Sequence, residues 1–347
     1  MSLLHIENLS INVNTNSGIY SIIDRLSLRM SDKETLGIVG ESGSGKSMLA
    51  IAIMGLLSPN IEMRADYLSL DGEDLMKLSN QDRRQYISSK AAIIFQDPKS
   101  SLNPCYTVSA QISETLSAHG LHNKKMRQIR ILELLDDVGI MQPERVLSMF
   151  PHQLSGGMNQ RIAIAIAIAC KPRLLIADEP TTALDLTIQS QILDLIIKLN
   201  KEDEVGIILI THDLALLAEN TDKIAVIYSG QLMEHASTKN ILRAPLHPYT
   251  QSLLSSVPNI GERHTRGSRL FALRGQIPTI DKLPVGCRLG PRCPNAQKHC
   301  VTPPRLKSIP NHGKVRCHLV EQSSGVHTKK ERFQPFPNSR RSEEFIS

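Results

Sequence analysis

Short apolar runs, separated by longer stretches with helical spacing, recur along the first two thirds of the chain. Each run ends at a Gly, Asp or Pro, and together they span residues 35–40, 91–97, 173–180, 205–213 and 223–230. Runs of this length predict strands that are buried on both faces. Residues 45–57 and 188–200 have the apolar spacing of helices. Strands that alternate with helices predict an α/β fold built on a mainly parallel sheet.

The middle of the chain departs from this alternation. Residues 107–120 and 125–139 both have helical spacing with no strand between them, so a helical insertion is expected at about residues 97–170. Residues 162–170, IAIAIAIAC, are apolar throughout and therefore lack a polar face. Their Ala content and the two glycines upstream favour a buried helix. The run is far shorter than the roughly 20 residues that a membrane-spanning helix needs.

The pattern fades after Pro258, where the sequence becomes rich in Pro, Gly and Arg. A chain of 347 residues, 41% of them apolar, is long enough for one large domain and an appendage. We therefore expect an α/β domain over residues 1–257, a cysteine-bearing extension over residues 258–320 and a disordered tail over residues 321–347.

Charge also separates the two parts of the chain. The formal net charge is +6, but residues 261–347 hold 17 Lys and Arg against 6 Asp and Glu. Such a basic segment suits lipid headgroups, nucleic acid, a negatively charged cofactor or simply solvent. The first residues, MSLLHIENLS, lack the basic start and the apolar run of a signal peptide. A cytosolic protein is therefore expected, and there clustered cysteines bind metal more often than they form disulfides.

A glycine-rich stretch carries the first sign of nucleotide chemistry. GESGSGKS follows a predicted strand, precedes a predicted helix and fits the phosphate-binding pattern G-x-x-x-x-G-K-[ST]. Backbone N–H groups of such a loop surround phosphate oxygens at a helix N-terminus. Lys46 is expected to neutralise phosphate charge and Ser47 to ligate Mg²⁺. The candidate nucleotide-binding residues are Gly40, Glu41, Ser42, Gly43, Ser44, Gly45, Lys46 and Ser47.

A second stretch, RLLIADEP, ends a predicted buried strand with two carboxylates, Asp178 and Glu179. Asp178 is expected to join the Mg²⁺ shell, as the second acidic position of such NTPases does. Glu179, placed beside a metal-bound phosphate, is expected to orient or deprotonate the attacking water.

A further glycine-containing helix start lies in HQLSGGMNQR, which contains Leu154, Ser155, Gly156 and Gly157. A small hydroxyl and two glycines at a helix N-terminus suit a bound anion. One chain needs only one phosphate-binding loop for each nucleotide. A second anion site therefore predicts that two chains share each nucleotide.

In these motifs the chain resembles the ATP-binding cassette (ABC) family, for which LSGG is the signature. The resemblance covers about residues 1–250, and the motifs follow in the family's order. It implies a P-loop NTPase of α/β class with a mainly parallel sheet, an antiparallel β part and a helical insertion. It also implies bound ATP and Mg²⁺, with Ser47, Gln96 and Asp178 as the Mg²⁺ ligands.

The resemblance assigns roles to four more residues. Gln96 in FQD resembles the residue that senses the γ-phosphate and contacts a transmembrane partner, and His212 in THD resembles the switch histidine that holds the γ-phosphate. With Glu179 they form the expected catalytic set. Asp185 in TTALD resembles the residue at the seam between two cassettes. Tyr20 lies where the family places a ring that stacks on adenine.

Longer stretches narrow the resemblance. FQDPKSSLNPCYTV, LHPYTQSLL and PVGCRLGPRCPNAQKHC are similar to the ATP-binding subunits of bacterial dipeptide and oligopeptide permeases of the D-subunit type. The implied function is an ATPase that powers peptide import. ATP-binding subunits for antimicrobial-peptide (Sap-type) uptake and for nickel uptake share this layout and remain alternatives.

The same resemblance implies an assembly. Two cassettes close on two ATP molecules, the second cassette being a homologous F-type subunit or the chain itself. Closure is passed to two transmembrane permease subunits, and an extracytoplasmic binding protein delivers the peptide. The expected location is the cytoplasmic face of the bacterial inner membrane. A soluble cassette ATPase is a second class of function, but the single Gly-rich loop and the absence of a sustained heptad run argue against it. A nucleic-acid-binding protein is a third class, suggested by the basic cysteine-bearing tail, although no nucleic acid is expected as a partner of the importer.

Four of the six cysteines lie near the end of the chain, at Cys287, Cys293, Cys300 and Cys317. The spacing lacks the tight pairs that zinc prefers, although His299, His312 and His318 offer further ligands. Wider loops suit a cubane held by four thiolates, although the spacing is not a common ferredoxin pattern. Some of the subunits that the chain resembles hold a [4Fe–4S] cluster in a segment of this kind. Such a cluster is therefore expected, with Zn²⁺ as the alternative and a disulfide framework or an incidental cluster as the remaining interpretations.

Overall fold

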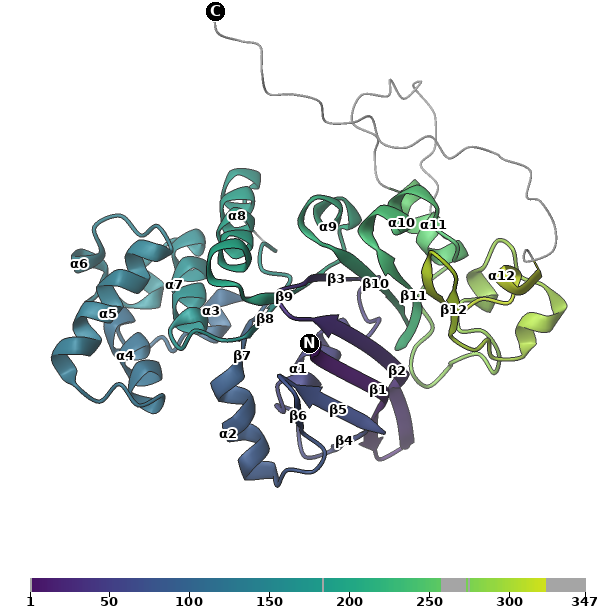
Figure 1. Ribbon diagram of the computed structural model, residues 1–347, viewed down its shortest axis with the longest axis horizontal. Coiled ribbons are helices and arrows are strands. Elements are labelled where there is room, and N and C mark those ends of the chain that lie inside the picture. The colour runs from purple at the N-terminus through teal and green to yellow at the C-terminus, as the bar shows by residue number, and fades with distance from the viewer. Residues whose placement is uncertain (1, 183, 257–272, 274, 323–347) are drawn as a thin grey trace, which may run out of the picture.

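The computed structural model describes residues 2–182, 184–256, 273 and 275–322. The predicted boundary at residue 257 and nearly all of the predicted tail lie outside these residues. Two β-sheets, a group of helices at one end and a small irregular segment at the other end make up the fold (Figure 1).

The larger sheet contains eight strands in the order β12-β13-β11-β10-β3-β9-β8-β7. The strands are β3 (Thr35–Val39), β7 (Ala91–Ile94), β8 (Leu174–Asp178), β9 (Gly206–Thr211), β10 (Lys223–Tyr228), β11 (Gln231–Ser237), β12 (Lys307–Ile309) and β13 (Gly313–Val315). Neighbours from β10 to β7 are parallel, and the remaining pairs are antiparallel. Strands β3, β8 and β9 are buried at every residue, as parallel strands covered on both faces must be. All five strands predicted from apolar runs are confirmed.

The smaller sheet is antiparallel throughout and has the order β2-β1-β5-β6, with β4 also paired to β1. Its strands are β1 (Ser2–Thr15), β2 (Gly18–Ser31), β4 (Ile61–Arg64), β5 (Tyr67–Leu70) and β6 (Glu73–Asp74). Aliphatic residues of β1 and β2, such as Ile6 and Leu28, share a buried cluster with Ile38 of β3 and Leu49 of α1 (Lys46–Ile53). This sheet therefore holds the first helix against the larger sheet.

The helices between β7 and β8 gather at one end of the molecule (Figure 1). They are α3 (Pro98–Ser101), α4 (Val108–Ala118), α5 (Lys124–Asp137), α6 (Pro143–Val146), the 3-10 turn η1 (Pro151–Gln153) and α7 (Gly156–Ile168). Ile112, Leu134 and Ile162 belong to the buried cluster that joins these helices. The uniformly apolar residues 162–168 lie in α7, so the expected buried helix is confirmed there.

The remaining helices of the described residues lie outside this group. They are α2 (Asn80–Lys90), α8 (Leu186–Asp203), α9 (Leu214–Asn220), α10 (Thr238–Arg243), α11 (Pro248–Ser255) and α12 (Leu319–Gln322). In the part of the chain that the structure describes, none of the helices combines the length and the apolar character that crossing a lipid bilayer requires.

The cysteine-bearing segment is attached to the larger sheet. It contains the 3-10 turns η2 (Gly290–Arg292) and η3 (Lys298–Val301), and its hairpin β12–β13 pairs with β11. Glu234 of β11, fully buried, accepts hydrogen bonds from Nε2 of His312 at 2.7 Å and from the backbone N–H groups of Leu246 and His247 at 2.9 and 3.0 Å. These bonds hold the Glu234 pKa below its ordinary value in spite of burial, which opposes them. The segment is thus joined to the core by a buried, hydrogen-bonded carboxylate.

Candidate nucleotide-binding and hydrolysis site

Parallel strands bring the predicted site residues to one edge of the larger sheet. β7, β8, β9 and β3 run in the same direction, so their carboxyl ends lie together. The Gly-rich loop follows β3, and β8 ends at Asp178. Gln96 comes two residues after β7, and His212 comes directly after β9. Positions far apart in sequence thereby converge on one place.

The Gly-rich loop closes around the ammonium group of Lys46. Its Nζ donates to the carbonyl oxygens of Gly40 at 2.8 Å and Glu41 at 3.1 Å. Gly45 caps the start of α1 with φ of 100°, and a Cβ there would lie 2.8 Å from Cδ1 of Ile23. Only glycine adopts this backbone without strain and leaves room for the strand. The loop conformation is therefore fixed by its own residues and by β2.

Electrostatics connect the loop to the end of β8. Burial lowers the pKa of Lys46, while the carboxylates of Glu179, Asp178 and Glu41 oppose that shift. Burial raises the pKa of Asp178, a hydrogen bond with Ser47 lowers it, and the nearby charge of Glu179 raises it further. The ammonium group of Lys46 and the hydroxyl of Ser47 therefore lie close enough to interact with the carboxylates of Asp178 and Glu179.

The oxygen atoms around Asp178 fit a divalent cation. Among the described residues, Oδ1 of Asp178 and Oγ of Ser44 are buried side-chain atoms without a hydrogen-bond partner. An orphaned buried carboxylate oxygen is costly unless a ligand satisfies it. Mg²⁺ prefers oxygen ligands of this type and keeps several waters. Asp178 and Ser47 therefore fit the expected Mg²⁺ site.

Glu179 lies at the centre of the predicted catalytic set. Nε2 of Gln96 donates to its Oε2 at 3.1 Å, and Nδ1 of His212 lies 3.4 Å from its Oε1. Oγ1 of Thr182 donates to the same Oε2 at 3.0 Å. Glu179 also has a φ of 47°, in the left-handed region, and its N–H donates to the carbonyl of Ile210 at 2.9 Å. Strained backbone of this kind often occurs at functional sites.

These contacts bear on one expected residue, Gln96, and add one that was not expected, Thr182. Gln96 is hydrogen-bonded to Glu179 in this structure, so its role as a Mg²⁺ ligand stays a prediction. Thr182 was not singled out from the sequence, although it lies three residues after Glu179 inside the TTALD motif. A hydroxyl residue three positions after a carboxylate, in the turn that follows a strand, was the sequence feature that could have predicted this contact.

The signature residues form the N-terminus of α7. Oγ of Ser155 accepts from the N–H of Met158 at 3.3 Å and so caps the helix. A Cβ on Gly157 would lie 2.9 Å from Cγ2 of Ile188, so glycine permits close contact with α8. Asp185 caps α8 by accepting from the N–H of Ile188 at 3.0 Å. Leu154 is partly buried and packs against the buried cluster that joins these helices. A Cβ on Gly156 would lie 3.5 Å from Cδ2 of Leu184.

The signature is separated from the Gly-rich loop of the same chain. Figure 1 shows α7 among the helices at one end, whereas α1, which follows the loop, lies behind the smaller sheet near the centre. The structure brings together the loop, Asp178, Glu179, Gln96 and His212, but it does not add the LSGG residues to them.

Tyr20 lies on β2, the strand that packs against the loop. Ile23, three residues later, is the neighbour of Gly45 described above. The Tyr20 ring is partly exposed, its hydroxyl lies 3.2 Å from Oγ of Ser17, and the adjacent Ile19 is 71% exposed. An exposed apolar strip beside a phosphate-binding loop is compatible with stacking on a base. The role of Tyr20 in adenine binding stays a prediction.

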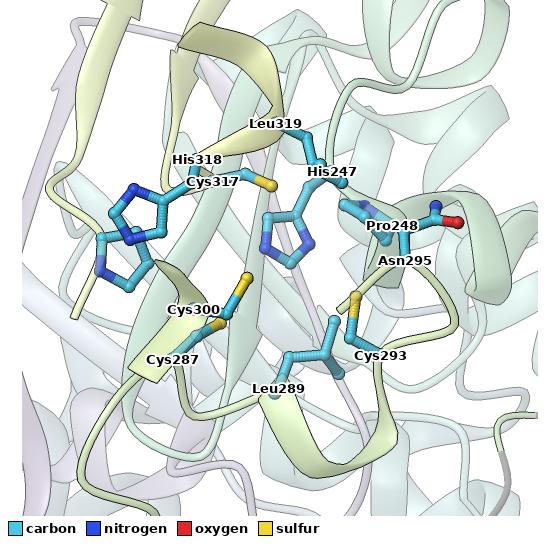
Figure 2. A pocket seen from close by; sticks show the side chains of 12 residues that line it. His247, Pro248, Cys287, Leu289, Cys293, Asn295, Cys300, Cys317, His318 and Leu319 are labelled. Atoms are coloured by element: carbon cyan, nitrogen blue, oxygen red, sulfur yellow. The ribbon is translucent and has the colours of Figure 1, made fainter. Parts of the chain in front are cut away.

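The four clustered cysteines line one cavity, together with His247 and His318 (Figure 2). All six cysteines of the chain are free thiols, so the disulfide interpretation is wrong. Burial raises the pKa of the Cys287 and Cys293 thiols, and it raises that of Cys317 to about 11. Thiols with pKa values raised in this way stay protonated unless a positive centre displaces the protons.

The four cysteines gather around one cavity, but the described residues show no metal-binding arrangement there. Within residues 2–182, 184–256, 273 and 275–322, no group of three or more His, Cys, Asp and Glu side chains is arranged to hold a metal ion. His312 does not belong to a zinc set, because its Nε2 is bound to Glu234 and it does not line the cavity. His299 is not a lining residue either. Neither an iron–sulfur cluster nor Zn²⁺ is therefore established.

Comparison with known families supports the interpretation of the motifs. The family model described as "ABC transporter" matches residues 23–182. A second model, described as "Oligopeptide/dipeptide transporter, C-terminal region", matches residues 233–300. The second match includes three of the four clustered cysteines.

Individual relatives extend over nearly the whole chain. The dipeptide transport ATP-binding protein DppD of Haemophilus influenzae is 49% identical over 329 residues, which cover 94% of this chain and 98% of the relative. The peptide transport system ATP-binding protein SapD of Salmonella typhimurium is 42% identical over 324 residues, covering 92% and 98%.

A solved structure confirms the fold. A dimeric post-hydrolysis state of the ATP-binding cassette MJ0796, bound to ADP and Pi, has a TM-score of 0.61 at 27% identity and covers 68% of this chain and 98% of that chain. The expected cassette fold, with its parallel sheet, antiparallel sheet and helical insertion, is therefore confirmed.

Proposed function

The chain belongs to the ATP-binding cassette family of transporter ATPases, and from this premise we propose that it powers the import of dipeptides or oligopeptides. The observation that carries the proposal is the convergence of the loop lysine, Asp178 and the Glu179 cluster at one edge of the sheet. The peptide substrate is supported by the match of residues 233–300 and by the names of the DppD and SapD relatives.

We assign the chemistry to the chain's own residues. The Gly-rich loop and Lys46 bind the phosphates of ATP, and Ser47 and Asp178 hold Mg²⁺, which supplies positive charge against the phosphates. Glu179 orients the attacking water and takes up its proton. Gln96, His212 and Thr182 hold the Glu179 carboxylate in place before the nucleotide enters. Tyr20 stacks on the adenine.

A second cassette completes the site. Ser155, Gly156 and Gly157 present a capped helix N-terminus away from the chain's own loop, where it suits the γ-phosphate held by another chain. Leu154 and Asp185 belong to the same surface. The dimeric relative supports this arrangement. The narrower expectation of an F-type partner is wrong as a detail, and the solved relative is a dimer of the cassette MJ0796.

The proposed assembly places the chain at the cytoplasmic face of the inner membrane, bound to two permease subunits. An extracytoplasmic binding protein supplies the peptide. Residues 1–257 form the proposed nucleotide-binding domain, with the helical subdomain at about 97–170, and residues 258–320 the extension.

Reconstitution tests this function. The chain is expressed together with permease subunits from its own source, purified from detergent-solubilised membranes and placed in proteoliposomes. Co-purified permease subunits and ATP-dependent uptake of labelled di- or tripeptides support the proposal. Uptake of nickel, or of cationic antimicrobial peptides alone, would transfer the assignment to the corresponding importer. Co-purified nucleic acid without permease subunits would contradict a transport function.

The cysteine cavity is the proposed place of a [4Fe–4S] cluster, with Zn²⁺ as the alternative. Four thiols around one cavity match the ligand number of a cubane. Burial raises the pKa of the Cys287 thiol and the charge of Arg316 lowers it against that effect, so this arginine would offset thiolate charge. A bound centre would connect the loops of a segment whose strands have only three residues each.

A further inference from the structure

An arginine of the cysteine-bearing segment reaches the Gly-rich loop. Nη1 of Arg292 donates to both carboxylate oxygens of Glu41, at 3.1 and 3.0 Å, although the two residues are 251 positions apart in sequence. The Arg292 side chain is 8% exposed and that of Glu41 is 32% exposed. A charge-assisted contact so shielded from water is stronger than an ordinary surface ion pair.

The guanidinium of Arg292 is itself held in place by aromatic rings. Nη1 donates to the hydroxyl of Tyr228 at 3.2 Å, and the guanidinium carbon lies 5.7 Å from the centre of the Tyr228 ring. The rings of Tyr228 and Tyr249 meet edge to face at 4.8 Å, and both are fully buried. Arg292 therefore has little freedom to turn away from Glu41.

Glu41 is also held through its main chain. Its N–H donates to the hydroxyl of Tyr249 at 2.8 Å. Its carbonyl oxygen accepts from Nζ of Lys46 at 3.1 Å and from the N–H of Ser44 at 3.2 Å. The residue paired with Arg292 is thus the one whose carbonyl positions the phosphate-binding lysine.

A second arginine acts on the same loop from another side, but indirectly. Arg288 donates to the carbonyl of Ser229 and to Oδ2 of Asp24, the latter at 3.2 Å. The next residue, Gly230, donates its N–H to the carbonyl of Ser44 at 2.8 Å. Arg288 therefore supports a turn that supports the loop, whereas Arg292 contacts the loop itself.

We propose that Arg292 is a positioning residue for ATP binding, so that the cysteine-bearing segment forms part of the nucleotide site. Arg292 acts in two ways. It fixes Glu41 and with it the carbonyl that holds Lys46, and it neutralises a carboxylate beside the place of the triphosphate. This inference rests on the proposed function, because it requires that the loop binds ATP.

The ion pair between Arg292 and Glu41 predicts how substitutions at either residue change the affinity for MgATP. Arg292→Ala leaves the Glu41 carboxylate unpaired beside the phosphates, so the dissociation constant for MgATP rises, by roughly tenfold. Removing that carboxylate as well, in Arg292→Ala with Glu41→Gln, relieves the repulsion and restores part of the affinity. Arg292→Lys keeps the positive charge and retains more affinity than Arg292→Ala.

Equilibrium binding of a fluorescent ATP analogue with Mg²⁺ to the full chain tests the inference. Binding stoichiometry and the thermal unfolding midpoint are measured beside the dissociation constant. A merely structural loss lowers the number of binding sites and the midpoint without changing the affinity of the folded fraction, and it is not relieved by Glu41→Gln. Arg305→Ala, an exposed arginine of the same segment, is the matched control and should bind as the unaltered chain does.

The outcomes separate this inference from the proposed function. If the unaltered chain binds the analogue and Lys46→Ala does not, the loop binds nucleotide. Equal affinity of Arg292→Ala and the unaltered chain then overturns the role of Arg292 alone, as does a double variant no tighter than Arg292→Ala. Should Arg292→Ala fail to fold, Arg292→Lys with and without Glu41→Gln gives the same comparison. Failure of the unaltered chain to bind overturns the proposed function and this inference together.

Discussion

Nδ1 of His212 lies 3.4 Å from Oε1 of Glu179, with the histidine side chain 65% exposed and the carboxylate side chain 16% exposed. The carboxylate therefore lies at the base of the site and the imidazole at its mouth. The second carboxylate oxygen is held by Gln96 and Thr182. Residues that follow β7, β8 and β9 thus meet at one carboxylate.

Replacing Glu179 by Gln should cut turnover at this chain's own site by orders of magnitude while leaving ATP binding nearly intact. The substitution keeps the size of the side chain and removes the charge that takes up a proton from water, an effect worth roughly 10²- to 10⁴-fold in rate. Hydrolysis is measured in an assembly whose partner site is also disabled, and binding is measured with the fluorescent analogue.

Gln96→Ala separates the catalytic role of Glu179 from the structural role of its contacts. This variant removes one hydrogen bond to the carboxylate but leaves the carboxylate itself, so the loss of rate should be smaller than for Glu179→Gln. Hydrolysis by Glu179→Gln at the rate of the unaltered site would refute the assignment of Glu179.

Features that depend on local rules could be predicted from the sequence. Buried strands such as β8 and β9 are continuous apolar runs, and a Gly-rich turn between strand and helix is recognisable from spacing alone. Parallel strands then place Asp178 and His212 at one edge. The positions of the main strands and of the α7 helix could therefore be predicted without coordinates.

Long-range partners could not be predicted in this way. The Arg292–Glu41 pair and the pairing of β13 with β11 join segments separated by hundreds or tens of residues. Strands of three residues, such as β12 and β13, are too short to show a period, and they form because β11 offers an edge. The Glu234–His312 bond belongs to the same class, since nothing local to His312 indicates a buried carboxylate partner.

Substitution of Ser155 should harm the partner's nucleotide site more than the chain's own. Ser155 caps α7, which lies among the helices at one end of the molecule, whereas α1 after the Gly-rich loop lies near the centre (Figure 1). The phosphate that Ser155 serves is therefore proposed to be held by the second cassette. In assemblies where only one Gly-rich loop is functional, Ser155→Arg should block hydrolysis when that loop belongs to the partner. Equal loss with either loop disabled would contradict a shared site.

Acid should destabilise the chain through His235 of β11. Burial and the nearby charges of Lys223 and Lys314 lower the pKa of His235 from 6.5 to about 4. The unfolded chain therefore binds a proton that the folded chain does not, and stability falls as pH decreases from about 6.5 toward about 4. Among the described residues, Nε2 of His235 is a buried atom without a partner, which agrees with a neutral ring.

Urea unfolding of the chain and of His235→Gln, at about pH 7 and about pH 5, measures this contribution. The unaltered chain should lose more stability between the two conditions, by on the order of 1 to 2 kcal/mol. Identical pH dependence of the two proteins would show that His235 is not the group responsible.

The cysteine cavity should bind a metal centre when the chain is purified without oxygen. Four partly buried thiols lie around one cavity, and burial raises the pKa values of Cys287, Cys293 and Cys317, so a positive centre that displaces their protons would be stabilising. A [4Fe–4S] cluster would give a brown protein with broad absorbance near about 400 nm and four iron atoms per chain. Cys293→Ser should lose the colour, whereas Cys105→Ser, an exposed thiol outside the cavity, should keep it. A colourless anaerobic preparation with one zinc per chain would assign the site to Zn²⁺, and a preparation without metal would contradict both assignments.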